Sequence, residues 1–380
     1  MTVNILHLHS TFALGGKEAR AVGLMNAFGP LARHTVLSGV PGETSARAAL
    51  APDIDARFPG DGPRLTGWAT PWRLHGIAAA MRGFDLVLTY NWGAFDAVMA
   101  RRLYGRAMGL PPLVHHEDGF NADEAVALDP RRNRYRRLGL AAATRFVVPS
   151  ERLEAIARTV WKQPEGRVVR IPNGVRVADY AAAPEPLPGI EKRPGEVLIG
   201  TVAGLRPVKN LPRLVRALAA MASPARLVIV GSGPESERIA AEARRCGVAD
   251  RVHMPGFLAD PARWIGGFDI FALSSDSEQF PISLLEAMAA GLPAVATAVG
   301  DVPNMLAPDN LPLVVAPNDE AAFAAALDTL AARPDLRRAL GRANRARAAE
   351  AYDEPQMIAR YAAVYGEAIG RPRAFMTGQA

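Results

Sequence analysis

The chain has 380 residues, of which 49% are hydrophobic and 22% charged, a composition that excludes a disordered or fibrous protein. Its length exceeds one ordinary hydrophobic core, so two domains are expected. Cys246 is the only cysteine, which excludes an intrachain disulfide, and neither a spanning apolar run nor a secretory signal is visible, so a cytoplasmic location is expected.

Short apolar runs rich in β-branched residues alternate with helix-like segments along the first half of the chain. Buried strands are predicted at residues 3–9, 84–90, 112–116 and 145–150. Strand and helix in regular alternation predict right-handed βαβ units, and therefore a parallel sheet covered on both faces.

The same alternation restarts after a proline-rich segment, residues 181–196, which is predicted to be a linker. Further strands are predicted within residues 196–204, 225–233, 251–256, 268–275 and 293–300. We expect an α/β fold with two doubly wound Rossmann-like domains, 1–180 and 181–355, whose parallel sheets face a central cleft. Residues 356–380 are predicted to form an amphipathic helix that packs back on the first domain.

Two polar segments follow strands in the first half, where doubly wound sheets bind their ligands. Gly15 and Gly16 open a helix and offer backbone amides to an anion, but they do not match the dinucleotide fingerprint G-x-G-x-x-G. Adjacent strand residues point to opposite faces, so His115 and His116 are not expected to share a metal ion. No metal site is predicted, and either His116 or Asp118 is expected to face the substrate.

The run RRNRYRR, from Arg131 to Arg137, supplies much of the formal net charge of +6. Three interpretations remain open for it: a solvated helix face, a site that attracts a phosphate-bearing or lipid-linked acceptor or an anionic membrane surface, and a nucleic-acid site. Nucleic acid is disfavoured because the run lacks the interleaved aromatic residues of a single-strand platform.

The loop VAGLRPVKN, residues 202–210, directly follows a predicted strand. Gly204 lets a ligand approach the backbone, and Arg206 and Lys209 place two cations at the carboxyl end of that strand. A guanidinium and an ammonium together suit a diphosphate. The alternative is an ordinary exposed loop ahead of a helix.

The segment SEQFPISLLEAMAAGLP, residues 277–293, combines two glutamates with a helix. Pro281 suits the first turn of a helix that ends near Gly291, and the free N–H groups of that turn form an anion site. Glu278 precedes the helix and Glu286 lies inside it, where each carboxylate is suited to accept hydrogen bonds from sugar hydroxyls. The alternative is a pair of solvated glutamates.

Taken together, these segments resemble the retaining glycosyltransferases of family 4, which have the GT-B fold. The resemblance rests on Gly15–Gly16, IPNGV at 171–175, the loop ending in Lys209, VGSGP at 230–234 and the spacing of Glu278 and Glu286. It implies that the first domain binds the acceptor and that the second binds a nucleotide-diphosphate sugar. This sugar donor is the co-substrate, and no cofactor is expected.

The resemblance also implies a role for each site residue. Glu278 binds donor-sugar hydroxyls and Glu286 the ribose. The diphosphate is held by Arg206, Lys209 and the backbone of Gly16, Gly204, Phe280, Pro281 and Ile282, with His116 or Asp118 near the sugar. Two departures stand out: Ala203–Gly204 replaces the usual glycine–arginine pair, so that Arg206 is expected to take over the arginine's role, and Gln279 replaces a frequent glycine.

The implied chemistry is metal-independent transfer with retention by front-face attack, because no carboxylate is an evident nucleophile. The acceptor is expected to be a sugar, a lipid-linked or a small molecule, with peripheral contact at the inner membrane face through residues 131–137. A nucleotide-sugar epimerase, or a non-catalytic protein that binds polyanions, remains the alternative.

Overall fold

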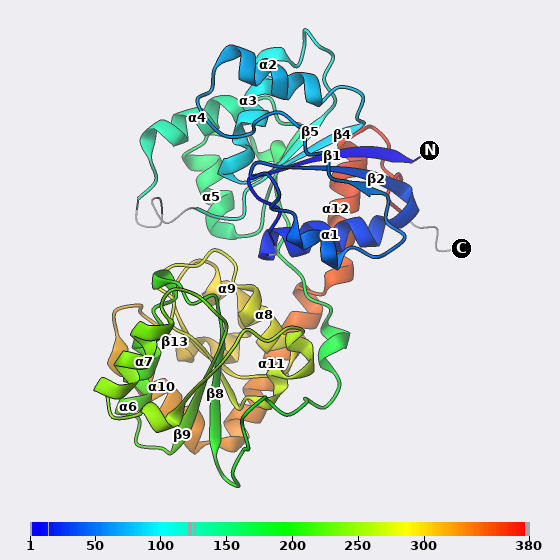
Figure 1. Ribbon diagram of the computed structural model, residues 1–380. Helices are drawn as coiled ribbons and strands as arrows, with labels where there is room; N and C mark the ends of the chain where they lie inside the picture. The colour runs from blue at the N-terminus through cyan, green and yellow to red at the C-terminus, as the bar shows by residue number, and fades with distance from the viewer. Residues whose placement is uncertain (1, 14, 121–123, 125–126, 377–380) are drawn as a thin grey trace. The chain divides into compact units, whose positions relative to one another are not determined.

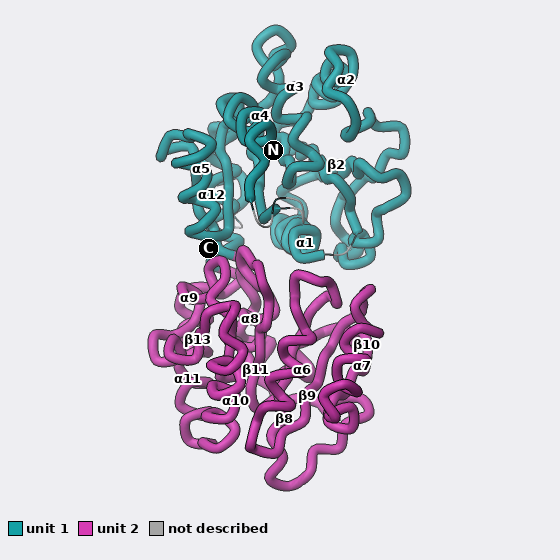
Figure 2. The backbone as a smooth tube through the Cα atoms, turned by 90° about the vertical axis from the view of Figure 1, so that its left-hand side faces the viewer, with its two compact units in different colours: residues 1–172, 356–380 teal, residues 173–355 magenta. Residues whose placement is uncertain are grey.

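The computed structural model describes residues 2–13, 15–120, 124 and 127–376, and the chain forms two compact units (Figure 2). Unit 1 consists of Met1–Pro172 and Gln356–Ala380, and unit 2 of Asn173–Pro355. The boundary thus falls at Pro172 rather than at the predicted residue 180. The intervening residues belong to unit 2 because Val175 and Val177 are buried in its core.

Unit 1 contains a parallel sheet whose strands, in the order β3-β2-β1-β4-β5-β6-β7, come from the first half of the chain (Figure 1). The strands are β1 (Val3–His9), β2 (Ala32–Ser38), β3 (Ala56–Arg57), β4 (Leu86–Tyr90), β5 (Leu113–His116), β6 (Arg145–Val148) and β7 (Val168–Arg170). The strand order reverses between β1 and β4, which are paired in register from Ile5 opposite Leu86.

Helices cover both faces of this sheet because alternate strand residues point to opposite sides. They are α1 (Gly16–Phe28), α2 (Pro71–Ala80), α3 (Phe95–Tyr104), α4 (Pro130–Leu140), α5 (Glu151–Thr159) and α12 (Glu354–Ala368). Leu6 and Leu8 of β1 pack in the core under α2, α3 and α5. Val3 and Ile5 pack in the other core, with Phe28 of α1 and the tyrosines of α12.

Unit 2 repeats this plan with a parallel sheet in the order β10-β9-β8-β11-β12-β13. The strands are β8 (Val197–Val202), β9 (Ala225–Val230), β10 (Val252–Gly256), β11 (Ile270–Leu273), β12 (Ala294–Thr297) and β13 (Val314–Val315). The helices are α6 (Leu211–Ala220), α7 (Ser236–Arg245), α8 (Ile282–Ala289), α9 (Val302–Met305), α10 (Glu320–Ala332) and α11 (Pro334–Ala351). Here the strand order reverses between β8 and β11.

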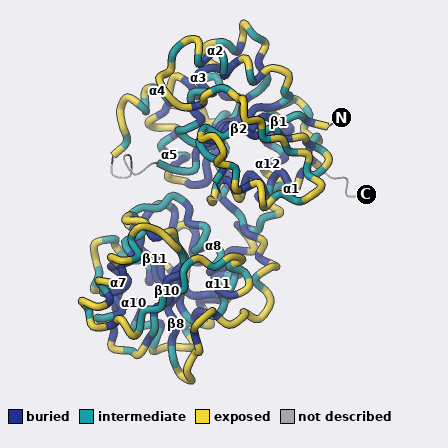
Figure 3. Tube along the Cα trace, in the orientation of Figure 1, coloured by how far each residue is buried: buried dark blue, intermediate teal, exposed yellow. Residues whose placement is uncertain are grey.

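Buried residues are concentrated on the strands inside unit 2 (Figure 3). Its core also divides into two parts, one on each face of the sheet. One part joins β8 and β11 to α8 and α11, and it takes in Leu187 and Ile190 from the expected linker. That segment is therefore anchored by its two apolar side chains. Within the part of the chain that the structure describes, no helix is both long enough and apolar enough to cross a membrane.

Candidate functional site

Lys209 and Glu278 meet at the carboxyl edge of the sheet in unit 2. Lys209 follows β8 and Glu278 follows β11, the two neighbouring strands at which the order reverses. Nζ of Lys209 lies 2.5 Å from Oε1 of Glu278, and the Ser275 hydroxyl donates to the same oxygen at 2.7 Å. Ligands of open α/β sheets bind at such reversals, so this ion pair marks the place where a ligand of unit 2 is expected.

The two loops that carry this pair are joined by further hydrogen bonds. The Ser274 hydroxyl donates to the Lys209 carbonyl at 3.0 Å, and the Asp276 amide donates to the Val208 carbonyl at 2.8 Å. The guanidinium of Arg213, on α6, donates to the Ser274 carbonyl and to the Asp276 carboxylate, both at 2.7 Å. Lys209 and Glu278 are consequently positioned by backbone contacts as well as by their own attraction.

The helix predicted after Pro281 is present as α8, with Pro281 as its N-cap residue in an extended conformation. Its first-turn N–H groups have no partner within the helix and form the positive end of its dipole. Phe280 and Pro281 are buried, which fixes the chain direction at the start of the helix. Gly291, with φ of +75°, follows the last turn.

Gly300, which follows β12, packs directly on the backbone of Glu278. A Cβ atom on Gly300 would lie 2.2 Å from the Glu278 carbonyl oxygen, and its φ of +55° is itself a left-handed conformation. The amide of Asp301 donates to the Gln279 carbonyl at 3.1 Å. A third loop therefore braces Glu278, and only glycine fits at that contact.

Glu286 lies in the second turn of α8, and its carboxylate is largely withdrawn from solvent. Burial raises the pKa of Glu286 to about 7, so a substantial fraction of this carboxyl group is protonated near neutral pH. The pKa of Tyr180 is also raised, first by its own burial and then by the charge of Glu286, which places the two side chains close together. The ion pairs and hydrogen bonds of the described residues do not connect Glu286 to Lys209 or Glu278.

Gly204 and Arg206 lie in the loop between β8 and Lys209, and both are exposed. In the described part of the chain, Arg206 makes no ion pair, so its guanidinium is available to an anion. This loop rests on the turn after β9: Cβ atoms on Gly231 and Gly233 would lie 1.8 Å and 2.5 Å from the carbonyl oxygens of Ala203 and Leu205. The glycines of VGSGP thus support the Gly204–Arg206 loop, as structural residues.

In unit 1, Gly15 is the N-cap residue of α1 and Gly16 its first residue; both are exposed. Leu14, which precedes them, lies outside the described residues, as does Asn121 at the end of the VHHEDGFN segment. Lys17 donates to the Thr11 carbonyl at 3.3 Å and pairs with Glu18, which holds the turn against the start of the helix.

His116 is enclosed in the core of unit 1 rather than exposed at the end of its strand. Its Nδ1–H donates to the Thr89 carbonyl at 3.1 Å, and its Nε2 accepts from the Tyr365 hydroxyl of α12 at 2.8 Å. Burial, reinforced by Arg20, lowers the pKa of His116 to about 3, so the imidazole is neutral. Both ring nitrogens are occupied, and we assign His116 to the attachment of α12 instead of to substrate contact.

Asp118 is held by Arg20 of α1 in a two-pronged ion pair, one bond of which measures 2.9 Å. Burial alone would raise the pKa of Asp118, but the Arg20 guanidinium outweighs it and leaves the pKa below its ordinary value. The Asp118 amide donates to Oδ1 of Asn91 at 2.7 Å, and Asn91 has a φ of +55° directly after β4. Asp118 is therefore an ionised part of a braced loop.

The arginine run forms most of α4, and its members differ in environment. Arg136 is buried, pairs with Glu124 through two bonds of 2.8 Å and 2.9 Å, and lies over the ring of Trp92. Arg131, Arg134 and Arg137 are exposed. Among the described residues, no group of three or more histidine, cysteine, aspartate or glutamate side chains is arranged to hold a metal ion.

Two family models match the chain. "Glycosyltransferase Family 4" matches residues 14–179, and "Glycosyl transferases group 1" matches residues 187–347. The fold is similar to that of Anabaena HepE. The TM-score is 0.77 for HepE in complex with UDP and 0.76 with UDP-glucose, at 19% identity, over 94–95% of this chain and 98% of HepE. The chain belongs to the family 4, group 1 glycosyltransferases, with two Rossmann-like domains of the GT-B type.

Curated relatives are similar over part of their length. N-acetyl-alpha-D-glucosaminyl L-malate synthase of Bacillus anthracis is 27% identical to this chain. The aligned part covers 46% of this chain and 46% of the synthase. D-inositol 3-phosphate glycosyltransferase of Segniliparus rotundus is 32% identical to this chain. The aligned part covers 69% of this chain and 64% of the transferase. The chain thus spans about half to two thirds of these first relatives.

Proposed function

We propose that this chain transfers a sugar from a nucleotide-diphosphate sugar to an acceptor hydroxyl. The observation that carries the proposal is the convergence of Lys209 and Glu278 at the reversal point of the sheet in unit 2. A cation for a phosphate and a carboxylate for sugar hydroxyls stand side by side there, as a sugar joined to a diphosphate requires. That Anabaena HepE was crystallised with UDP-glucose supports the same class of donor.

Each donor part has a partner in unit 2. Lys209, the free guanidinium of Arg206 and the first turn of α8 bind the diphosphate, with Gly204 allowing close approach. Glu278 accepts hydrogen bonds from the sugar, and Glu286 accepts them from the ribose of the nucleotide. The ionised carboxylate is the better acceptor of these hydrogen bonds, and a pKa of about 7 means that this form is populated as the pH rises through 7.

The transfer proceeds on one face of the sugar, so that the configuration at the anomeric carbon is retained. The bond between that carbon and the diphosphate oxygen breaks while the acceptor oxygen bonds from the same side, and the acceptor proton passes to the departing diphosphate. Lys209 and Arg206 stabilise the negative charge that develops on that leaving group. These two cations take the place of a metal ion, so the proposed activity is metal-independent.

Unit 1 binds the acceptor on this proposal. We expect the acceptor to be a sugar, a lipid-linked glycan or a small molecule of bacterial glycoconjugate synthesis. The exposed arginines Arg134 and Arg137 of α4 offer peripheral contact with the anionic inner face of a membrane. On this proposal the protein is cytoplasmic and associates with the membrane at its surface.

The test begins with thermal unfolding in the presence of UDP-, GDP- and ADP-sugars, because a ligand that binds the folded chain raises its melting temperature. We expect one nucleotide series to stabilise the chain, and the corresponding sugar to be transferred with an unchanged anomeric configuration, with and without EDTA. Product of inverted configuration, or activity that EDTA abolishes and Mg²⁺ restores, would contradict the mechanism.

A further inference from the structure

A cavity of about 580 Å³ opens on unit 1 beside the carboxyl ends of β1 and β4. Trp92 and Gly93, which form one wall, lie just after Asn91, the residue that follows β4. A Cβ atom on Gly93 would lie 2.1 Å from Cβ of Ser10, the residue after β1, so this wall reaches the point where the strand order reverses. The cavity thus occupies in unit 1 the kind of place where open α/β sheets bind their ligands.

The opposite wall is a loop that a single arginine holds in place. Arg73 of α2 donates hydrogen bonds to the carbonyls of Arg64, Leu65, Gly67 and Trp68, at 2.7–3.2 Å. The same guanidinium pairs with Asp96 of α3, and the Tyr135 hydroxyl of α4 donates to Asp96 at 2.8 Å. Hydrogen bonds at Asp96 therefore join α2, α3 and α4 around the cavity.

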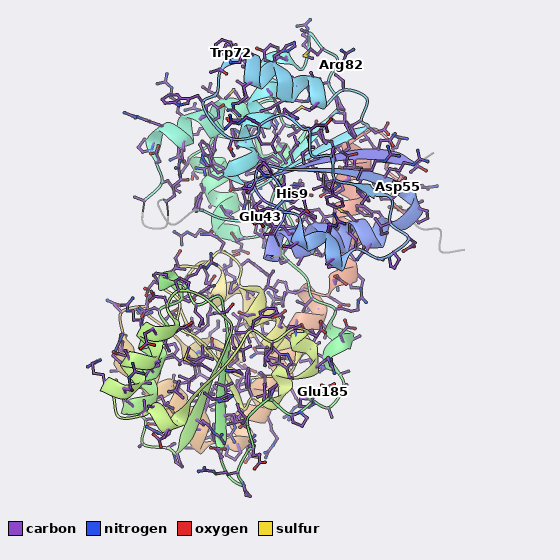
Figure 4. All side chains as sticks on the ribbon, viewed as in Figure 1. His9, Glu43, Asp55, Trp72, Arg82 and Glu185 are labelled. Atoms are coloured by element: carbon purple, nitrogen blue, oxygen red, sulfur yellow. The ribbon has the colours of Figure 1, made fainter. Side chains whose placement is uncertain are left out.

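Trp68, on this braced loop, is 90% exposed and lines the cavity. The hydrogen bonds of Arg73 to the carbonyls of Gly67 and Trp68 hold the loop that carries this indole at the cavity. Trp72, at the start of α2 (Figure 4), is 76% exposed. It is not among the residues that line the cavity. The two tryptophans therefore provide a matched comparison.

The lining favours a sugar ring over an apolar chain. The indole of Trp68 suits the slightly positive C–H groups of a pyranose, whereas the Trp92 ring is already covered by Arg136 and Phe95 and serves as a wall. Asp96 can accept hydrogen bonds from the sugar hydroxyls, and the Thr66 hydroxyl can accept or donate them. A hydrocarbon tail in the same cavity could make no hydrogen bond with the Thr66 hydroxyl or with Asp96, whose carboxylate already contacts Arg73 and Tyr135.

The rim carries one available cation. Arg131 is exposed and lines the cavity, and among the described residues its guanidinium makes no ion pair. Arg132 is different, because it pairs with Glu124 at 3.1 Å and lies 5.3 Å from the centre of the Trp92 ring. An anionic substituent on the bound sugar would be complementary to Arg131.

We infer that this cavity is the acceptor subsite and that its ligand is a sugar or polyol bearing a negatively charged group. The inference rests on the proposed glycosyl transfer and names the acceptor class for it. Trp68 positions the ring against the wall formed by Trp92, Asp96 accepts hydrogen bonds from its hydroxyls, and Arg131 binds the charged group.

The test uses the full-length chain labelled with 5-fluorotryptophan, which gives separate fluorine NMR signals for Trp68, Trp72, Trp92, Trp161 and Trp264. Titration with D-glucose 1-phosphate is expected to shift the Trp68 and Trp92 signals in a saturable way and to leave that of Trp264, in unit 2, unchanged. D-glucose and inorganic phosphate, each alone, are expected to bind at least about tenfold more weakly, since each lacks one of the two recognised parts.

Two pairs of variants separate the cavity from its surroundings. Trp68→Ala and Arg131→Ala are expected to weaken glucose 1-phosphate binding at least about tenfold, and Trp72→Ala and Arg134→Ala to leave it unchanged. Equal weakening by Arg131→Ala and Arg134→Ala, an absence of shifts at Trp68 and Trp92, or an equally strong response to UDP would overturn the inference.

The same variants keep the two proposals apart. Binding of UDP-glucose, measured by calorimetry, is expected to be unchanged in Trp68→Ala, because the donor residues lie in unit 2. A chain that bound glucose 1-phosphate in the cavity but transferred no sugar from any donor would refute the proposed function and leave the subsite standing.

Discussion

The ammonium group of Lys209 lies 2.5 Å from Oε1 of Glu278, and this ion pair spans the two loops at the strand-order reversal of unit 2. On the proposed function, one partner binds the diphosphate and the other the sugar. The two residues therefore neutralise each other in the ligand-free chain and must separate, at least in part, when the donor arrives.

This pairing predicts opposite effects of one substitution on two measurements. Glu278→Gln frees Lys209 from its ion pair. If that pair is worth up to about 1 kcal/mol, the affinity for the nucleoside diphosphate alone is expected to rise up to about fivefold. Turnover of the sugar donor is expected to fall about 100-fold, because the sugar loses its carboxylate. Calorimetry and a transfer assay measure the two effects, and Ser275→Ala, which keeps the charge of Glu278, should not raise the affinity. Weaker diphosphate binding by Glu278→Gln would contradict this relationship.

Glu286 makes stability depend on pH in a defined direction. Folding raises the pKa of this carboxyl group from 4.5 to about 7, because burial disfavours the ionised form. The folding stability that the group contributes is therefore fully present below pH 4.5 and is lost as the pH rises through 7. Glu286→Gln is therefore expected to match the wild type at pH 4.5 and to be more stable at pH 8, by at most about 3 kcal/mol. Urea unfolding at both pH values measures this, and a variant that is less stable at pH 8 would show that the carboxylate is stabilised.

His116 makes the opposite prediction for acid. Its pKa falls from 6.5 to about 3 on folding, so the stability it contributes is complete above pH 6.5 and is lost as the pH falls toward 3. One such group adds a slope of about 1.4 kcal/mol per pH unit. In urea unfolding between pH 7 and 5, His116→Gln should reduce the slope, whereas His75→Gln, at an exposed position, should not. Equal slopes for all three proteins would argue against a buried neutral imidazole.

Gly300 supports the site through its backbone alone. Gly300→Ala incurs both a left-handed conformation and a contact of 2.2 Å with the Glu278 carbonyl, so it is expected to destabilise the chain by more than about 2 kcal/mol and to impair transfer. Gly247, with φ of +69° and an open Cβ position, provides the control: Gly247→Ala is expected to cost about 1 kcal/mol and to leave activity unchanged. Equal loss in the two variants would mean that Gly300 does not brace the glutamate.

Much of the fold could be predicted because its signals are local. Buried strands such as β1 and β4 appear as apolar runs, and Pro281 and Gly291 mark the ends of α8 in the sequence itself. The domain boundary was less accessible, because residues 173–180 enter the core of unit 2 through single apolar side chains.

The sequence predicts which residues of the candidate site lie at strand ends. It does not predict which way a side chain points or whether another element covers it. The proximity of Lys209 and Glu278 follows from neighbouring parallel strands, whereas the enclosure of His116 depends on Tyr365, 249 residues away along the chain. Arg213 and Gly300 were missed for the same reason, although the glycine that follows β12 was a signal that such a contact exists.

The most direct test of the central claim is calorimetric binding of the nucleoside diphosphate that most stabilises the chain, measured on Lys209→Ala and Lys192→Ala. Lys192 is a lysine of the same unit that pairs with Asp269 at 2.7 Å, away from the proposed site. We predict that Lys209→Ala weakens binding at least about tenfold and that Lys192→Ala does not. Wild-type affinity in Lys209→Ala would contradict a donor diphosphate bound beside Glu278.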